Sequence, residues 1–188
     1  MAKSLLGKFV LAIPTRTAFA ISSGSWTGLP ANKVRPCLVT GFTESNQAIL
    51  APLCGAVYDK KRDTWDPRER MLGDHWMPVN FKDSGVIIPP LNSSFDPPTL
   101  KVAINAANLT AGDPPFKPCY LWVADLGEEI SIEDLLLLKQ HKALEGISKA
   151  DLQVIRDLGQ RISASKKKAQ PAVHIKATPF EPWGMRLV

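Results

Sequence analysis

Short apolar runs, separated by polar and proline-containing loops, fill the first two thirds of the chain. A run of this length bounded by turn residues is typical of a buried strand. Glu44, Ser45 and Asn46 separate two of these runs and indicate a hairpin turn. The runs that predict strands are residues 8–14, 36–42, 46–55, 76–81, 84–91, 100–105 and 119–126.

Helical signals appear in the last third of the chain. Ser131 and Asp134 have the spacing of a helix N-cap, and Gly146 is the expected end of this segment. Ser148 and Asp151 repeat the cap for a second helix. Its apolar positions follow helical spacing at Leu152, Ile155, Leu158 and Ile162. Its polar positions Lys149, Gln153, Arg156 and Asp157 lie on other faces.

Strands that come first and helices that come last predict an α+β fold. We expect a small antiparallel β-barrel or curled sheet, with C-terminal helices within 131–162 packed at one side. Residues 1–162 form the expected single domain, which carries a long insertion at about 56–118 that begins with a highly charged stretch. Residues 163–188 are a basic, proline-containing tail.

Net charge and hydropathy narrow the class of protein only a little. The chain of 188 residues has a formal net charge of +5, part of which comes from the tail lysines 166–168. This charge is compatible with a polyanionic partner and equally with a solvated basic tail. No apolar run is long enough to span a bilayer, so we expect no membrane association. Lys8 and Pro14 interrupt the apolar N-terminus, which favours a first strand over a secretion signal.

The cysteines argue against a metal site and against a disulfide framework. Cys37, Cys54 and Cys119 are three in number and lack paired spacing. They favour a reducing compartment, the cytoplasm, with the nucleus as the open alternative. No glycine-rich nucleotide loop is present, and we expect neither a metal nor another cofactor.

Arg35 stands directly before Pro36 at the mouth of a predicted strand. Proline belongs at the start or edge of a strand and holds the residue before it in an extended conformation. A guanidinium fixed in this way suits a phosphoryl group, because it offers paired donors and keeps its charge. The alternative is a solvated or salt-bridged arginine at a strand end.

The order of several motifs resembles the PemK/MazF toxin family. The motifs are GKFVLAI, a Gly/Ser-rich loop, NKVRPCLV and NQAILAPL in residues 7–55, and more weakly LEGISKADLQVIRDLGQRI in residues 144–162. The resemblance implies an SH3-like barrel and a metal-independent endoribonuclease that acts on single-stranded RNA through internal transesterification. It also implies that Arg35 stabilises the scissile phosphate and that the barrel pairs as a homodimer.

Some residues depart from the family pattern and keep a second hypothesis open. Cys54 falls where the family has a Thr or Ser, and a thiol is a weak hydrogen-bond donor. Cys54 is either a partner of Arg35 in catalysis or a small buried hydrophobe. The second hypothesis is a non-catalytic interaction protein that retains the barrel and has lost the ribonuclease chemistry.

Two further residues are candidates for holding RNA. Trp26 lies in the loop before Arg35, with Lys33 between them, and an aromatic beside basic residues can stack a base. Trp26 alternatively folds the loop back on the barrel.

Residues 135–138 are consecutive leucines, which one helix face cannot bury together. We expect them to meet the insertion, the tail or a second subunit. The sequence identifies no antitoxin-like protein partner.

Overall fold

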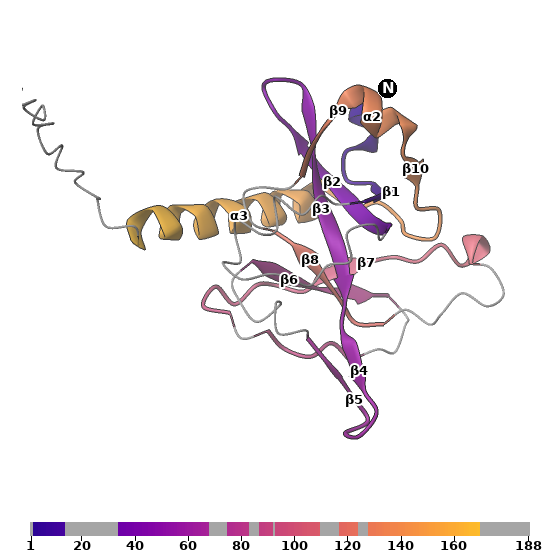
Figure 1. Ribbon diagram of the computed structural model, residues 1–188, viewed down its shortest axis with the longest axis vertical. Coiled ribbons are helices and arrows are strands. Elements are labelled where there is room, and N and C mark those ends of the chain that lie inside the picture. The colour runs from indigo at the N-terminus through magenta and orange to yellow at the C-terminus, as the bar shows by residue number, and fades with distance from the viewer. Residues whose placement is uncertain are drawn as a thin grey trace, which may run out of the picture.

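The structure is a computed structural model that describes residues 2–13, 34–67, 75–82, 87–91, 93–109, 117–123 and 128–169 (Figure 1). The strands are β1 (Phe9–Ala12), β2 (Arg35–Phe42), β3 (Gln47–Gly55), β4 (Val57–Asp59), β5 (Thr64–Asp66), β6 (Trp76–Phe81), β7 (Leu100–Val102), β8 (Cys119–Trp122), β9 (Glu128–Ser131) and β10 (Lys139–Gln140). The helices are η1 (Ala2–Leu5), η3 (Ala106–Asn108), α2 (Ile132–Leu137) and α3 (Lys149–Ala169).

The fold is α+β, with a curled mixed sheet that forms a half-barrel and one main helix, α3 (Figure 1). The strand order is β10-β1-β2-β3-β8-β6-β7, and β9 pairs with β3 beside this path. The expectation of an antiparallel sheet is wrong at one pair, because β6 and β7 run parallel. Residues 83–99 connect them and are long enough for the crossover that a parallel pair requires.

The two ends of this strand order are joined through backbone hydrogen bonds. Ile104, just after β7, forms an isolated antiparallel bridge with Leu144, after β10. On either side of the bridge, Asn105 N donates to Ala143 O at 2.9 Å, and Glu145 N donates to the carbonyl of residue 103 at 3.0 Å. These bonds satisfy backbone groups that an open sheet edge would leave to water.

The first predicted hairpin is present. Strands β2 and β3 pair antiparallel, and the chain reverses at Asn46, whose φ of 62° is positive. Asparagine tolerates this left-handed conformation better than most residues. The register then shifts between Val39 and Gly41, so Thr40 is an extra, bulged residue that faces no residue of β3 in the pairing register.

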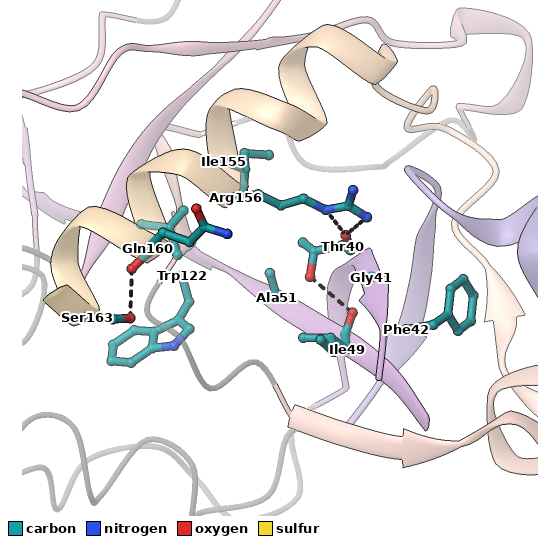
Figure 2. A pocket seen from close by; sticks show the side chains of 12 residues that line it. Thr40, Gly41, Phe42, Ile49, Ala51, Trp122, Ile155, Arg156, Gln160 and Ser163 are labelled. Atoms are coloured by element: carbon teal, nitrogen blue, oxygen red, sulfur yellow. Dashed lines mark hydrogen bonds between the residues drawn. The ribbon is translucent and has the colours of Figure 1, made fainter. Parts of the chain in front are cut away.

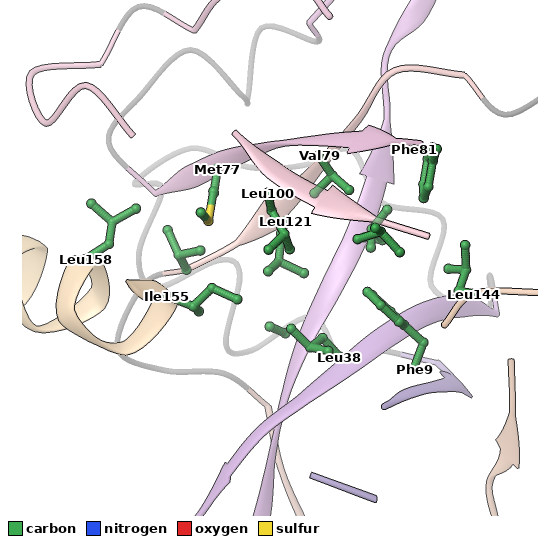
Figure 3. Close-up of a cluster of buried hydrophobic side chains, with 14 of the residues drawn as sticks. Phe9, Leu38, Met77, Val79, Phe81, Leu100, Leu121, Leu144, Ile155 and Leu158 are labelled. Atoms are coloured by element: carbon green, nitrogen blue, oxygen red, sulfur yellow. The ribbon is translucent and has the colours of Figure 1, made fainter. Parts of the chain in front are cut away.

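The main core lies between the curled sheet and α3 (Figure 3). Phe9, Leu38 and Leu121 are among its sheet residues. The helix contributes Ile155 and Leu158 to this core, in agreement with the predicted apolar face. Gly159 lets the helix approach closely, because a Cβ there would lie 2.8 Å from Val123 O. Burial of this face is what holds α3 against the sheet.

The first of the two predicted helical segments is much shorter than expected. Ser131 caps α2 as its hydroxyl accepts a hydrogen bond from Asp134 N at 3.0 Å. The helix ends at Leu137, not near Gly146, because the following residues 139–140 form β10 and pair with β1. Helix α3 begins after Ser148, whose hydroxyl accepts from Asp151 N at 3.0 Å.

The range 56–118 contributes both to the main sheet and to a separate hairpin. Strands β6 and β7 belong to the main sheet, whereas β4 and β5 form a two-stranded sheet of their own (Figure 1). Residues 87–91, which belong to a run predicted as a strand, form no strand.

Within the described part of the chain, no helix is both long and apolar enough to cross a bilayer.

Candidate functional site

Arg35 is the first residue of β2, and strand pairing fixes its backbone. It lies opposite Ala12 of β1, with Pro36 opposite Leu11. The extended conformation expected before a proline is therefore present. The carbonyl of Arg35 also accepts a hydrogen bond from Cys37 Sγ at 3.6 Å.

The structure brings together the two residues that the resemblance pairs. Arg35 Nη1 donates to Cys54 Sγ at 3.8 Å, across the β2–β3 pair. Both residues are buried, with exposed fractions of 7% for Arg35 and 1% for Cys54. Arg35 is thus neither the solvated nor the salt-bridged arginine of the alternative hypothesis in the described part of the chain.

Cys54 lies in a cluster of aromatic side chains on one face of the sheet. It pairs with Tyr120 of β8, and both pack with Trp76 and Trp122. The two tryptophan rings meet edge to face, with centroids 4.9 Å apart. The Tyr120 hydroxyl donates to Pro89 O at 2.8 Å, so its proton is engaged by the backbone. Cys54 is therefore a small buried hydrophobe as well as the neighbour of Arg35.

Burial of Arg35 has an electrostatic consequence. A guanidinium stays charged at any physiological pH, and a buried charge without an opposite charge costs several kcal/mol. Among the described residues, no carboxylate forms an ion pair with Arg35. The thiol of Cys54 is a weak acceptor, so it compensates this charge only in part.

The neighbouring thiol of Cys119 is unsuited to act as a nucleophile. Burial raises the pKa of Cys119 to about 12, helped by Cys54 and opposed by the Lys117 ammonium. Burial likewise raises the pKa of Tyr120 to about 12. Both groups therefore hold their protons at neutral pH, and a nucleophilic cysteine must lose its proton.

Trp26 and Lys33, the other residues predicted to hold RNA, lie outside the described residues. In the charged β4–β5 hairpin, Arg62 forms ion pairs with Asp59 and Asp66, so the charges there offset one another. Trp65 packs against the Tyr58 ring at 5.2 Å.

Sequence patterns missed a groove between α3 and the bulged end of β2 (Figure 2). Its volume is about 470 Å³, and Arg156 lies in its wall. The helical pattern placed Arg156 on a polar face and gave no further signal. Only the bulge at Thr40, a tertiary feature, gives this arginine a partner on the sheet.

No group of three or more His, Cys, Asp or Glu residues in the described part of the chain is arranged to hold a metal ion. Comparisons with protein-family models, with curated proteins and with solved structures found no match to this chain.

Proposed function

We propose that this protein is a barrel-type RNA-binding protein of PemK/MazF character that holds single-stranded RNA without cleaving it. The second half of this proposal, the absence of cleavage, is supported by the burial of Arg35. Its side chain is buried against a thiol, with an exposed fraction of 7%. Transition-state stabilisation requires donors aimed at a reacting group that can reach them.

The chemistry beside Arg35 also favours binding over turnover. Internal transesterification needs a group that takes a proton from the 2′-hydroxyl and a group that protonates the leaving oxygen. Among the described residues, the side chain that Arg35 donates a hydrogen bond to is Cys54, whose thiol is a poor donor to phosphate. The nearby Cys119 thiol and Tyr120 hydroxyl both have a pKa raised to about 12.

The RNA-directed half of the proposal is supported by the motif order and by charge. Strands β1, β2 and β3 are consecutive and antiparallel, which is compatible with the SH3-like barrel that the resemblance implies. The formal net charge of +5 favours association with a polyanion. A superposition of β1, β2 and β3 on such a barrel tests the fold, and a different strand order would end that part of the proposal.

The decisive experiment separates binding from cleavage. Purified protein is incubated with single-stranded RNA in the presence of a chelator, and both retention and fragment length are followed. We expect salt-dependent binding and intact RNA. Cleavage that disappears in Arg35→Ala would replace this proposal by the nuclease, whereas absence of binding at low salt would remove RNA as the partner.

The endoribonuclease remains the second candidate, and one observation favours it. Arg35 and Cys54, separated by 19 positions in the chain, are in contact as the family pattern implies. Cleavage would require the residues around Arg35 to open so that RNA reaches the guanidinium. Arg35→Lys keeps the charge but loses the paired donors, so a nuclease would lose most of its rate in this variant.

Self-association is part of the proposal, through the leucines of α2. Leu135 is buried in the body, but Leu136 and Leu137 have exposed fractions of 47% and 81%. We propose that a second subunit covers them. Sedimentation at micromolar concentration tests this, with Leu137→Glu as the disrupting variant. A mass near 20.6 kDa for the unmodified protein would refute the dimer.

A further inference from the structure

The groove between α3 and the end of β2 has an apolar floor and one charged side chain in its wall. Its floor is apolar and includes Ile49, Ala51 and Trp122. Arg156 and Gln160 extend over it from α3, one helical turn apart (Figure 2). Among the described residues that line the groove, Arg156 is the one with a charge.

The bulge in β2 fixes the Arg156 guanidinium. Thr40 is the extra residue, so its carbonyl is turned away from the regular ladder. This carbonyl accepts two hydrogen bonds from Arg156, from Nε at 3.0 Å and from Nη2 at 2.8 Å. The Thr40 hydroxyl donates to Ile49 O at 3.2 Å and holds the bulge against β3. The arginine is therefore preorganised, although it is exposed.

Three of the five guanidinium N–H donors of Arg156 are left for a ligand. Arginine has five N–H donors, and Nε and one hydrogen of Nη2 serve the Thr40 carbonyl. Of the other three, one hydrogen of Nη1 and the second hydrogen of Nη2 form the fork that binds phosphate or carboxylate in a bidentate manner. Arg156 has no ion pair within the described part of the chain. The neighbouring Asp157 carboxylate instead accepts a hydrogen bond from Gln153 at 2.8 Å.

Gln160 adds a second polar anchor. In the described part of the chain its amide makes no hydrogen bond, and it stands exposed above the apolar floor. An amide offers a donor and an acceptor side by side, which matches the edge of a nucleobase. Gly41 leaves open the space beside the guanidinium, since a Cβ there would lie 3.6 Å from Arg156 Nη2.

We propose that this groove binds one nucleotide, with its phosphate on the Arg156 fork and its base over the apolar floor beside Gln160. The combination of a fixed cation, an apolar surface and a free amide fits an anion joined to a planar polar ring. The groove volume is within the range of small-ligand sites, roughly 300–1,000 Å³. The proposal rests on the proposed function for the source of the nucleotide, single-stranded RNA, but uses a site distinct from Arg35.

The test uses free nucleotides, so it does not depend on RNA binding. Isotope-labelled protein is titrated with adenosine and uridine 5′-monophosphates, and with the two nucleosides that lack the phosphate. We expect amide shifts at residues 40–42 and 155–163, and at least tenfold weaker binding of the nucleosides, since a hydrogen bond to a charged group contributes about 1.5–3 kcal/mol. Equal binding of nucleosides and monophosphates would overturn the proposal.

Matched variants locate the site. Arg156→Met removes the fork and is expected to weaken monophosphate binding at least tenfold, whereas Arg161→Met removes an exposed charge from the same helix outside the groove. Gly41→Val keeps Arg156 but fills the space beside it, and is expected to weaken binding as well. Gln160→Leu should reduce binding severalfold. Unchanged affinity in folded Arg156→Met and Gly41→Val proteins would refute the site.

Parallel titration with a single-stranded oligoribonucleotide separates this inference from the proposed function. Monophosphate binding without oligoribonucleotide binding supports the groove and refutes the RNA function. The opposite result is a protein that binds the oligoribonucleotide but not the monophosphates, with oligoribonucleotide binding unchanged in Arg156→Met. This result refutes the groove and supports the RNA function.

Discussion

The two ends of strand β2 present two arginines in opposite situations. At its start, Arg35 is buried and its guanidinium contacts the Cys54 thiol at 3.8 Å. At its end, the exposed Arg156 of α3 donates twice to the carbonyl of Thr40. The same chemical group is thus enclosed at one end and partly available at the other.

Backbone geometry explains the difference. At the start of β2, Arg35 pairs regularly with Ala12 of β1, and its side chain is buried. At its end, the bulge at Thr40 exposes a carbonyl that the helix can reach. A buried cation lowers stability unless something compensates it, whereas an exposed, anchored cation retains donors for a ligand at little expense. We therefore assign ligand binding first to the Arg156 end.

The largest expected effect comes from lifting α3 away from the Arg156 end. In Gly159→Val the added Cβ would lie 2.8 Å from the carbonyl oxygen of Val123, a backbone atom that cannot move easily. We expect the free energy of unfolding to fall by about 2–3 kcal/mol, measured by urea denaturation. The control Ala164→Val, at an exposed site of the same helix, should change it by less than about 0.7 kcal/mol. Equal effects would show that α3 does not depend on this close approach.

Replacing the buried arginine should have the opposite sign. Arg35→Met removes a charge that has no ion pair in the described part of the chain and keeps much of the apolar stem. We expect the free energy of unfolding to rise by about 1 kcal/mol or more, because well-packed apolar side chains often replace buried ions favourably. Arg35→Ala, which leaves a cavity, is the comparison variant and should not be stabilised. A loss of stability in Arg35→Met would mean that the charge is compensated in the folded protein.

The exposed arginine should contribute moderately. Arg156→Met breaks both hydrogen bonds to Thr40 O and leaves this carbonyl to water or without a partner. We expect the free energy of unfolding to fall by about 1 kcal/mol. Arg161→Met, on the same helix with an exposed side chain, should stay within about 0.5 kcal/mol of the original protein. Identical stabilities of the two variants would contradict the anchoring role of the bulge.

The smallest effect at neutral pH concerns the groups beside the Arg35 end. Burial raises the pKa of Cys119 from 9.0 to about 12 and the pKa of Tyr120 from 10.0 to about 12. The folded state therefore binds these protons more tightly than the unfolded state. The stability linked to them is complete below about pH 9 and is lost as the pH rises towards 12.

Denaturation at several alkaline pH values measures this loss, and Cys119→Ala should show a shallower decline. Below pH 8 the two proteins should share the same pH dependence, because the Cys119 thiol is protonated in both states. A parallel decline of both proteins above pH 9 would exclude Cys119 as a source of the effect.

Local patterns were enough to predict the elements that depend on neighbouring residues. The hairpin at Asn46, the caps at Ser131 and Ser148 and the apolar face of α3 are present in the structure. Each depends on residues close in the chain, whose spacing the sequence displays directly. The Arg35–Cys54 neighbourhood followed from the resemblance, because paired strands bring these positions together.

Where partners distant in the chain compete for a segment, only the tertiary structure decides which element forms. Helix α2 ends at Leu137, within the leucine-rich segment, because residues 139–140 pair with β1 as a strand. Strand β7 runs parallel to β6 because their connection crosses over, which local propensity does not encode. The Arg156 groove needs a bulge in β2 and a helix from the other end of the chain. The hydrogen bond from Arg156 to Thr40 O joins residues that are 116 positions apart in the chain, and its energy depends on their distance in space.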